Sequence, residues 1–535
     1  MRALLVQPEF PVTYWGFQHG LAIAGRKVSL PPLGLLTLAA ELPQDWELRL
    51  VDLNVAPLRD EDVCWSDVVL VGGMLIQSVS MHQVLARARA LGRRSVVGGP
   101  APSTAPDEFA DADVVFRGEA EGRIDHLVQA IRSDGRCVLT APENRPDLEA
   151  IPVPRYDLIQ AKHYASMSVQ YSRGCPYNCE FCDIISIFGR RPRVKSPEQI
   201  LRELEALYAS GHRGSVFVVD DNFIGNRPKV KQLLPHIAEW QKERGHPFEL
   251  YTEASVNLAG DKALMEGMVE AGFTSVFLGI ETPSAEALAH AQKTQNLKLD
   301  LHVAVETVNR YGMEVMAGFI VGFDEDDETC FERQDVFISS SGIPLAMVGL
   351  LSALPDTQMW RRLEREGRIR ETPTGDHFDR PNFETKLDER VLLAGYRSLM
   401  ARVYSPDAYY DRCETFLDRA KELPGRRPVR FRDLVTLARA VWMLGLRGTH
   451  RERFWRLIWR TLSRQRWAFP WVVAHAIMGE HCIRYTREDV LPRIEKAIEE
   501  VERERRVAAA VAAQPPAAAD PQPAAADSQP EAVPA

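Results

Sequence analysis

Three cysteines stand close together in the middle of the chain, at Cys175, Cys179 and Cys182, with the spacing C-x3-C-x2-C. Gly174 and Pro176 indicate a loop there, directly after a strand-like run. Zinc sites and four-cysteine iron–sulfur sites need a fourth ligand. The other five cysteines are scattered singly, at Cys64, Cys137, Cys330, Cys413 and Cys482. A [4Fe–4S] cluster held by three thiolates would leave one iron open to a small molecule.

The elements that would position this loop form an alternating series of strands and helices. Strands are expected at residues 167–173, 216–219, 250–254, 275–280, 315–321 and 345–350, and a helix capped by Ser196 at residues 197–210. Such a series fits a partial (β/α)6 barrel, in which chemistry gathers at the carboxyl ends of the strands. Acidic side chains stand at those ends: Asp220, Asp221, Glu253 and Glu281.

The cysteine loop resembles the cluster loop of the radical S-adenosylmethionine (SAM) enzymes. The resemblance implies a [4Fe–4S] cluster held by Cys175, Cys179 and Cys182, with SAM chelated to the open iron through its amino and carboxylate groups. Phe181 stands where that family keeps an aromatic residue whose backbone approaches the adenine. Zinc, or a chance grouping of cysteines, is the alternative.

The acids at the strand ends also match the radical SAM pattern. Asp220 and Asp221 lie where the family contacts the SAM amino group, and Glu253 and Glu281 match positions used for ribose or methionine contacts. A carboxylate can form charge-assisted hydrogen bonds with an ammonium group. Any one of these acids could instead be a solvated strand end or a helix N-cap.

The first 140 residues show a second alternating pattern. Short apolar runs at residues 3–7, 47–53, 68–72, 95–98 and 113–116 are separated by helical spacing at residues 32–42 and 79–91. This pattern predicts a doubly wound, Rossmann-like parallel sheet with its ligand at the carboxyl ends of the strands. Glycines that would let backbone approach a large ligand follow the strands, at Gly72, Gly73, Gly98, Gly99 and Gly118. A G-x-G-x-x-G fingerprint is absent, which weakens a dinucleotide interpretation.

Residues 31–36, 97–100 and 118–122 together resemble the cobalamin-binding domain of the cobalamin-dependent radical SAM enzymes. The D-x-H-x-x-G signature of cobalamin mutases and methionine synthase is missing. The resemblance therefore implies cobalamin bound without a histidine ligand from this domain. The alternative is a flavodoxin-like domain that is kept for packing or has lost its cofactor.

The whole chain is expected to fold as an α/β protein with several units. These are a cobalamin-binding Rossmann-like domain at 1–140, a linker at 141–165, a radical SAM partial barrel at 166–358, a helical domain at 359–506 and a disordered Ala/Pro-rich tail at 507–535. The helical extension loosely resembles the C-terminal domain of hopanoid methylases.

Residues 426–467 hold twelve arginines and four tryptophans against two acids. A basic helix with interleaved tryptophan can lie at an anionic membrane surface, and docking there would bring the barrel mouth near a lipid-soluble substrate. Arginine and aromatic interleaving also suits RNA, although the net charge of −9 argues against general affinity for nucleic acid. A helical bundle with a solvated arginine face is the remaining alternative.

The cysteines and the start of the chain indicate the cellular compartment of the protein. Eight cysteines, three of them needed as thiolates, fit a reducing compartment. The first residues read as a strand without a signal peptide, and no apolar stretch is long enough to span a bilayer. We expect a cytoplasmic protein, with peripheral contact at the inner face of the membrane through residues 426–467.

The resemblance implies an enzyme. In that family an electron donor of the flavodoxin or ferredoxin type reduces the cluster, SAM is cleaved to a 5′-deoxyadenosyl radical that abstracts hydrogen, and methylcobalamin supplies a methyl group. The expected reaction is methylation of an unactivated carbon in a small-molecule or lipid substrate, with a hopanoid-like lipid as one candidate. With the same cofactors the outcome could be cyclisation, rearrangement or oxidation. A cobalamin- or redox-sensing binding protein is the alternative of another class.

Overall fold

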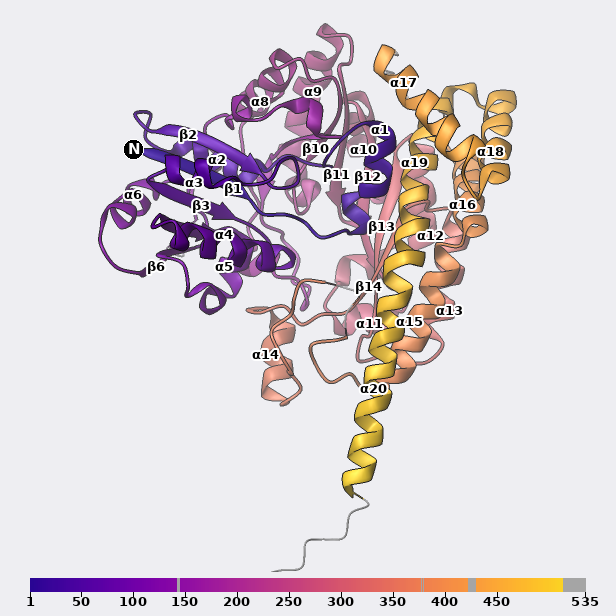
Figure 1. The fold of residues 1–535 in the computed structure, drawn as a ribbon. Coiled ribbons are helices and arrows are strands. Elements are labelled where there is room, and N and C mark those ends of the chain that lie inside the picture. The colour runs from indigo at the N-terminus through magenta and orange to yellow at the C-terminus, as the bar shows by residue number, and fades with distance from the viewer. Residues whose placement is uncertain (142–144, 377, 379, 422–429, 513–535) are drawn as a thin grey trace, which may run out of the picture.

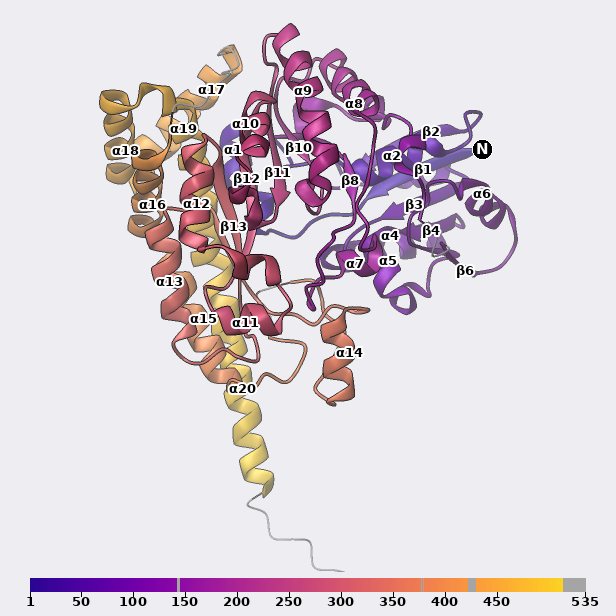
Figure 2. The ribbon, with the colours of Figure 1, turned by 180° about the vertical axis from the view of Figure 1, so that it is seen from behind.

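The computed structural model describes residues 1–141, 145–376, 378, 380–421 and 430–512. Two six-stranded, wholly parallel sheets stand side by side, and helices from the C-terminal third cover the outer edge of the second (Figures 1 and 2). The described residues therefore form the predicted α/β architecture with a helical C-terminal region. No helix among the described residues is long and apolar enough to cross a membrane.

The first sheet has the strand order β2-β1-β3-β4-β5-β6. Its strands are β1 (Arg2–Gln7), β2 (Glu47–Asp52), β3 (Val68–Gly72), β4 (Arg94–Gly98), β5 (Val114–Arg117) and β6 (Cys137–Thr140). Helices α2 (Leu33–Glu41), α3 (Asp60–Trp65), α4 (Ser78–Ala90), α5 (Pro100–Thr104) and α6 (Ile124–Arg132) accompany it. Five of the strands were expected from their apolar runs. Strand β6 was missed because it is a short edge strand whose residues are partly or fully exposed.

The second sheet is ordered β14-β13-β12-β11-β10-β7, as consecutive right-handed crossovers require for an open barrel. Its strands are β7 (Met167–Val169), β10 (Gly214–Val218), β11 (Phe248–Ala254), β12 (Phe273–Glu281), β13 (Glu314–Val321) and β14 (Ala346–Leu350). The outer helices are α8 (Pro197–Ala209), α9 (Arg227–Glu243), α10 (Lys262–Glu270), α11 (Ala285–His290), α12 (Leu301–Arg310) and α13 (Cys330–Ser341), and a short α7 (Ile184–Ile187) follows the cysteine loop. Ser196 caps α8 as predicted, accepting a hydrogen bond from the Gln199 amide.

One expected strand is wrong in extent. Residues 167–173 were predicted as a single strand, but β7 ends at Val169 and the next residues form β8 (Ser172–Arg173), paired antiparallel with β9 (Arg193–Val194). The cause is Asp220, whose carboxylate accepts hydrogen bonds from the Tyr171 and Ser172 amides, both at 2.8 Å. Those amides are thereby removed from the sheet ladder, and the chain turns into the cysteine loop.

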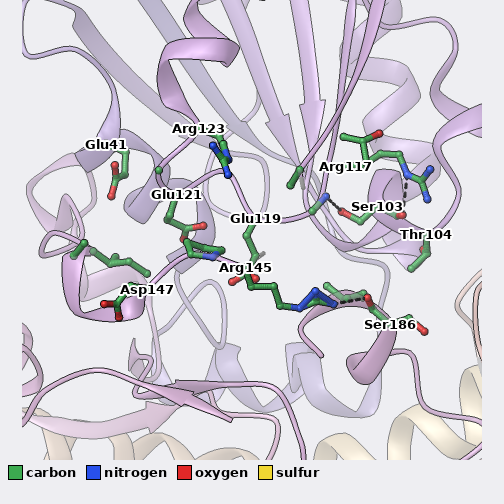
Figure 3. Close-up of a pocket in the computed structure, with 18 of the residues that line it drawn as sticks. Glu41, Ser103, Thr104, Arg117, Glu119, Glu121, Arg123, Arg145, Asp147 and Ser186 are labelled. Carbon is green, nitrogen blue, oxygen red and sulfur yellow. Dashed lines mark hydrogen bonds between the residues drawn. The ribbon is translucent and has the colours of Figure 1, made fainter. Parts of the chain in front are cut away.

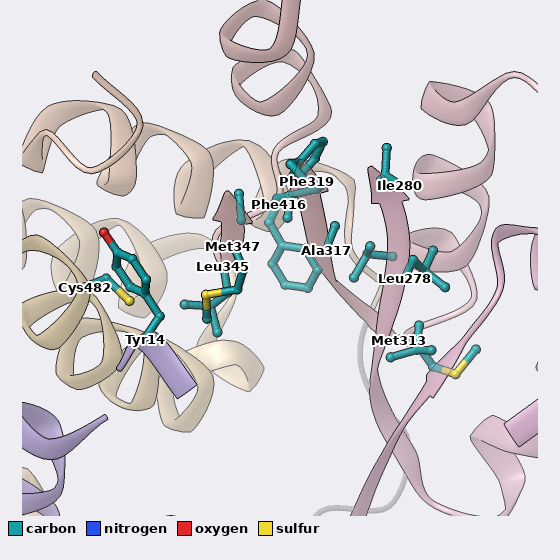
Figure 4. Close-up of a cluster of buried hydrophobic side chains, with 14 of the residues drawn as sticks. Tyr14, Leu278, Ile280, Met313, Ala317, Phe319, Leu345, Met347, Phe416 and Cys482 are labelled. Atoms are coloured by element: carbon teal, nitrogen blue, oxygen red, sulfur yellow. The ribbon is translucent and has the colours of Figure 1, made fainter. Parts of the chain in front are cut away.

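The C-terminal helices are α14 (Gln358–Arg365), α15 (Glu389–Val403), α16 (Pro406–Arg419), α17 (Phe431–Ala440), α18 (Arg451–Arg464), α19 (Phe469–Tyr485) and α20 (Leu491–Ala512). They close the edge of the second sheet at β14. Tyr396 and Tyr404 donate hydroxyl hydrogen bonds to the Val348 and Ala346 carbonyls, each at 2.8 Å. Apolar side chains of the sheet and of the helices, such as Met347 and Phe416, belong to one buried cluster (Figure 4). An exposed edge strand invites pairing with other chains, so this cover protects the open barrel.

Two expectations about the C-terminal third change with the structure. Helix α20 runs to Ala512 and so includes residues 507–512 of the predicted disordered tail, because alanine is the strongest helix former. Residues 513–535 and 426–429 lie outside the described residues. In the basic segment, Arg453 and Arg460 form ion pairs with Asp411 and Asp418 of α16, which favours the bundle interpretation for that face.

Candidate functional site

The cysteine loop is held by backbone contacts and by one buried acid. Gly174 has a φ of +95°, and a Cβ there would lie 2.7 Å from the Gly189 carbonyl oxygen, so only glycine fits. The amide of Cys175 donates to the same oxygen at 3.2 Å. Asp220 also accepts from the Ser172 hydroxyl at 2.6 Å, so its two oxygens are taken by the strand that leads into the loop. Burial raises the pKa of Asp220 to about 6, partly offset by these donors.

The three thiols differ in burial and in their hydrogen-bond partners. Cys179 is buried, whereas Cys175 and Cys182 are half-buried. The side-chain amide of Asn222 donates to Cys175 Sγ and that of Gln295 to Cys179 Sγ, both at 3.6 Å. Amide donors of this kind are among the means by which proteins tune iron–sulfur clusters. Among the described residues, no three His, Cys, Asp or Glu side chains are placed to hold one metal ion.

A buried ion pair marks the carboxyl end of β12. Glu281 has a φ of +64°, a conformation that costs a non-glycine residue free energy and that clusters at functional sites. Its carboxylate pairs with Lys293 Nζ, which lies 5.8 Å from the ring centroid of Phe181. Burial alone would lower the pKa of Lys293, but the Glu281 carboxylate raises it above its usual value, so the ammonium persists.

The other two predicted acids lie near this pair. Asp221 accepts a long hydrogen bond from the Gly174 amide at 3.4 Å, and burial and the Asp220 carboxylate raise its pKa to about 7. Burial, then Asp221 and Glu281, raises the pKa of Glu253 to about 8. The structure thus brings Asp220, Asp221, Glu253 and Glu281 to one end of the sheet. Sequence reasoning did not assign roles to Lys293, Asn222 and Gln295, although Asn222 directly follows the predicted Asp220 and Asp221.

The inner face of the second sheet, opposite its helices, carries large apolar side chains in layers. Val216 and Val218 pack against the helices, so the intervening Phe217 points inward. Phe217 and Tyr251 are register partners, and their rings stack with centroids 4.7 Å apart. The next layer toward the carboxyl end holds Phe277, with Glu253 and Met316 beside it in register. The phenylalanine, tyrosine and methionine side chains are all half-buried rather than enclosed.

Two glycines form the layer beyond, directly below the acids. Gly279 and Gly318 are register partners. A Cβ at Gly279 would meet the Glu281 carboxylate at 2.4 Å, and one at Gly318 would meet the Phe277 ring at 2.9 Å. The glycines therefore leave room for the Glu281–Lys293 pair to lie across the inner face, next to the Phe277 ring.

A segment that follows β1 of the first sheet reaches this face. Tyr14 is buried against the C-terminal helices, where it stacks on Tyr404 and shares a hydrogen bond with Thr486. The neighbouring Trp15 turns the other way, is 47% exposed, and meets Phe277 with ring centroids 4.9 Å apart. Residues from all three parts of the chain thus place one tryptophan at the inner face of the second sheet.

The predicted glycines of the first sheet lie at its carboxyl edge, at Gly72, Gly73, Gly98, Gly99 and Gly118. Packing within the chain already requires several of them. A Cβ at Gly73 would meet Met81 Sδ at 2.7 Å, one at Gly118 would meet Ala141 at 2.9 Å, and one at Gly99 would meet the Gly73 backbone at 3.1 Å. Close packing of neighbouring loops therefore explains these glycines without any ligand.

A cavity of about 620 Å³ opens at the same edge, between the first sheet and α7 (Figure 3). Ser103, Gly118, Glu119, Arg145 and Ser186 are among the residues that line it. Of the five predicted glycines, only Gly118 takes part in the described lining, and no described lining residue is a histidine. A pocket at the carboxyl ends of parallel strands is the usual place for a ligand in this architecture.

Buried charges join the two sheets beside this cavity. Glu119 accepts hydrogen bonds from Arg173 and Arg193, both at 2.8 Å, and Glu121 accepts from Arg173 at 2.6 Å. All four side chains are at most 16% exposed. Because Arg173 directly precedes the cysteine loop, this cluster fixes the edge of the first sheet relative to that loop.

Comparison with known proteins finds matches over most of the chain. The Radical SAM superfamily model matches residues 169–333, and the Domain of unknown function (DUF4070) matches residues 357–495. An uncharacterised methyltransferase of Synechocystis sp. is 40% identical over 91% of this chain and 92% of its own length. Hopanoid C-2 methylase of Rhodopseudomonas palustris is 38% identical over 91% of this chain and 94% of its own length.

A solved structure shows the same fold. The radical SAM methyltransferase TsrM of Kitasatospora setae, solved with cobalamin and a [4Fe–4S] cluster bound, superposes with a TM-score of 0.58 at 16% identity. The match covers 87% of this chain and the whole of TsrM. With relatives this similar along nearly its whole length, the chain belongs to the cobalamin-dependent radical SAM family of enzymes.

Proposed function

We propose that this enzyme methylates an unactivated carbon of a bulky, apolar, polycyclic substrate of the hopanoid type. The single observation that carries the substrate class is the inner face of the second sheet, where Phe217, Tyr251, Phe277 and Met316 lie half-buried and Trp15 is added from the first sheet. Aromatic side chains offer large apolar areas for burial against a ligand. The name of the 38% identical relative, hopanoid C-2 methylase, supports the same class.

In this proposal Cys175, Cys179 and Cys182 hold the [4Fe–4S] cluster. The donor set fits that group because three thiols share one loop and amide groups donate to two of the sulfurs. A cluster takes each thiolate on a different iron, so convergence on one point is not needed. The reducing conditions of the cytoplasm would keep the thiols available, and an electron donor of the flavodoxin or ferredoxin type completes the system.

SAM would lie between the cysteine loop and the carboxyl ends of β11 and β12. Glu281, Asp221 and Glu253 would receive its ammonium and hydroxyl groups, and the backbone at Phe181 would lie beside its adenine. Asp220 would act indirectly, by holding the strand that enters the loop. Lys293 would hold the Glu281 carboxylate in place through their ion pair.

Cobalamin would lie at the carboxyl edge of the first sheet, next to the cavity beside α7. When bound, the cofactors supply radical generation and the methyl group, while the protein positions them and excludes water. The Glu119–Arg173 contact would set the distance between the two cofactor sites. A histidine ligand is not part of the proposal, because none lines the described cavity.

The test is an anaerobic incubation of cluster-reconstituted, cobalamin-loaded protein with a pentacyclic triterpenoid and SAM that carries a labelled methyl group. Mass spectrometry should find the label in a methylated product. A cyclised, rearranged or oxidised product without label would support the alternative reactions. Absence of SAM consumption under reducing conditions would favour a cobalamin- or redox-sensing binding protein.

Peripheral contact with the inner face of the membrane also belongs to this proposal. The sequence places it in residues 426–467, and the described part of that segment offers two different surfaces. One is the α16-facing side, where arginines are already paired with acids. The other is the outer side of α17, where Phe431 and Leu434 are exposed.

A further inference from the structure

Large apolar side chains gather on the outer side of α17 and α18. A π-helical turn, η10 (Val441–Leu446), continues α17 without a break. The apolar face consists of side chains that are between 42% and 82% exposed: Phe431, Leu434, Trp442, Met443, Leu446 and Trp459. Single exposed apolar residues are normal on a protein surface, but a contiguous group marks a surface that meets another apolar partner.

The exposed residues recur with helical periodicity. Phe431, Leu434, Trp442 and Leu446 follow one stripe of the continuous helix, while Ala440 and Leu444 on the opposite side are buried. The helix therefore has one apolar side packed into the protein and a second apolar stripe that faces outward. Packing within the described chain does not explain the outward stripe.

Arginines flank the stripe. Arg432, Arg439 and Arg447 are exposed on this segment and keep their positive charge without an ion pair to a described carboxylate. Arg432 donates a hydrogen bond to the Lys162 carbonyl at 3.3 Å, the Arg439 guanidinium packs over Gly25, and the Arg447 guanidinium lies 4.5 Å from the centroid of the Trp442 ring. No described carboxylate forms an ion pair with Arg439 or Arg447, nor with Arg451 or Arg464 on α18. The excess of positive charge complements an anionic surface, whereas Arg453 and Arg460 are already neutralised by α16.

We propose that the apolar face docks on the surface of an anionic lipid bilayer. Tryptophan rings favour the headgroup boundary, and arginines gain free energy near anionic lipids at the same depth. A helix with this arrangement lies in the plane of the interface. The inference rests on the proposed function for its biological role, because it would place the enzyme at the membrane that holds a lipid substrate. The membrane contact itself depends only on these residues.

Docking would orient the barrel in a way that the sequence did not indicate. Helices α17 and α18 pack on α19. In turn α19 meets the amino end of β13, where Trp471 Nε1 donates to Glu314 at 2.8 Å. The cysteine loop and α14 lie at the other end of the second sheet (Figure 2). The barrel mouth would therefore face away from the bilayer, contrary to the expectation that docking brings the mouth to the lipid.

The experiment is flotation of the full-length chain, without cobalamin or substrate, on vesicles of phosphatidylglycerol and phosphatidylcholine or of phosphatidylcholine alone. Protein should float with the anionic vesicles at low salt and much less at high salt. Arg439→Glu with Arg447→Glu should weaken this binding by at least about ten-fold, given the contribution of each basic residue near an anionic surface. Arg132→Glu with Arg361→Glu, exposed elsewhere, is the matched control and should leave binding unchanged.

A second variant tests the apolar contribution. Phe431→Ser, Leu434→Ser and Leu446→Ser together should abolish flotation, while Val79→Ser, Val303→Ser and Val336→Ser, equally exposed elsewhere, should not. Unchanged melting temperatures show that both sets still fold. The proposal is overturned if wild type stays soluble on every vesicle, if control and test variants behave alike, or if the wild type is a dimer that only the first triple variant dissociates. Because no catalysis is measured, failure here leaves the proposed reaction untouched.

Discussion

The two sheets of this enzyme share strand number and direction but differ in what their faces carry. The first sheet has helices on both faces, and its strands are runs of aliphatic residues such as Val68–Gly72. The second sheet packs helices on one face only. Its other face carries a mixture of aromatic, small and acidic residues: Tyr251 and Glu253 on β11, Phe277 and Gly279 on β12, and Met316 and Gly318 on β13.

The difference indicates where reactive groups can be placed. A strand buried on both faces offers a ligand only its carboxyl end, so the first sheet can hold a cofactor at its edge. A strand with one free face can offer side chains along its length, so the second sheet can hold both a cofactor and a large substrate. The Glu119–Arg173 contact then joins the edge of one sheet to the reactive loop of the other.

The largest expected effect concerns the cysteine loop. Replacing Cys175, Cys179 and Cys182 by alanine should remove all cluster iron after anaerobic reconstitution, because the cluster is proposed to be held by these three thiolates alone. Iron analysis and the iron–sulfur absorbance measure this. Cys64→Ala with Cys137→Ala, at exposed or half-buried positions, is the control and should keep full iron. Retention of four irons by the triple variant would refute the cluster assignment.

The buried pair on the second sheet should give the next largest effect. Lys293→Met leaves the Glu281 carboxylate buried without its partner, which typically costs about 3–5 kcal/mol of unfolding free energy. Adding Glu281→Gln should restore much of that stability but not SAM binding. Urea unfolding and equilibrium dialysis with SAM separate the two quantities. If the double variant binds SAM as wild type does, Glu281 is only structural.

A matched pair of glycine substitutions compares the sheets directly. Gly99→Ala in the first sheet meets both a positive φ of +95° and the Gly73 backbone, so it should lower stability by about 1–3 kcal/mol. Gly318→Ala in the second sheet meets the movable ring of Phe277, so stability should change less while triterpenoid binding weakens. Thermal unfolding and a binding titration test both. Equal loss of stability in the two variants would contradict the proposed difference between the two sheets.

A smaller effect is expected from Glu253 in protein without cofactors. Its pKa is raised to about 8 by burial and by neighbouring carboxylates, above the ordinary value of 4.5. The folded state therefore binds the proton more tightly than the unfolded state. The stabilisation is complete below pH 4.5 and is lost as the pH rises through about 8, at up to about 1.4 kcal/mol per pH unit.

Glu253→Gln removes this titration. Its unfolding free energy should vary less between pH 5 and about 8 than that of the wild type, as measured by urea unfolding at several pH values. Parallel curves for the two proteins would show that Glu253 is not the responsible group. Asp52→Asn, at a buried acid of the first sheet, serves as a comparison because its pKa is also raised by burial.

How much the sequence predicted depends on how local each feature is. Apolar runs identify ten of the strands in the two large sheets nearly to the residue, because burial on a parallel sheet requires them. The strand over residues 167–173 was overextended because Asp220, distant in sequence, captures its amides. Glu281 was predicted as a site residue from its place at a strand end. Lys293 could not be predicted, because the sequence does not show that the chain after α11 brings it back to Glu281.

The same limit applies to the glycines and the arginines, whose neighbours in space the sequence does not give. Gly73 and Gly99 are predicted to approach a ligand, and the structure adds that within the chain they pack against Met81 and against each other. Arg453 and Arg460 were counted as part of a basic surface, although acids of α16 neutralise them. Composition counts charges without showing which of them are paired. Trp15 lies in no sequence motif that would have indicated its place on the inner face of the second sheet.

The central claim is that the inner face of the second sheet binds the substrate beside SAM. The most direct test compares SAM cleavage with methyl transfer in Trp15→Ala, using Trp65→Ala, a half-buried tryptophan of the first domain, as control. Removing an aromatic anchor typically costs at least about 2 kcal/mol of binding. Trp15→Ala should therefore cleave SAM while methyl transfer to a pentacyclic triterpenoid falls by at least about ten-fold. Unchanged transfer, or an equal fall in both activities and in the control, would contradict the account.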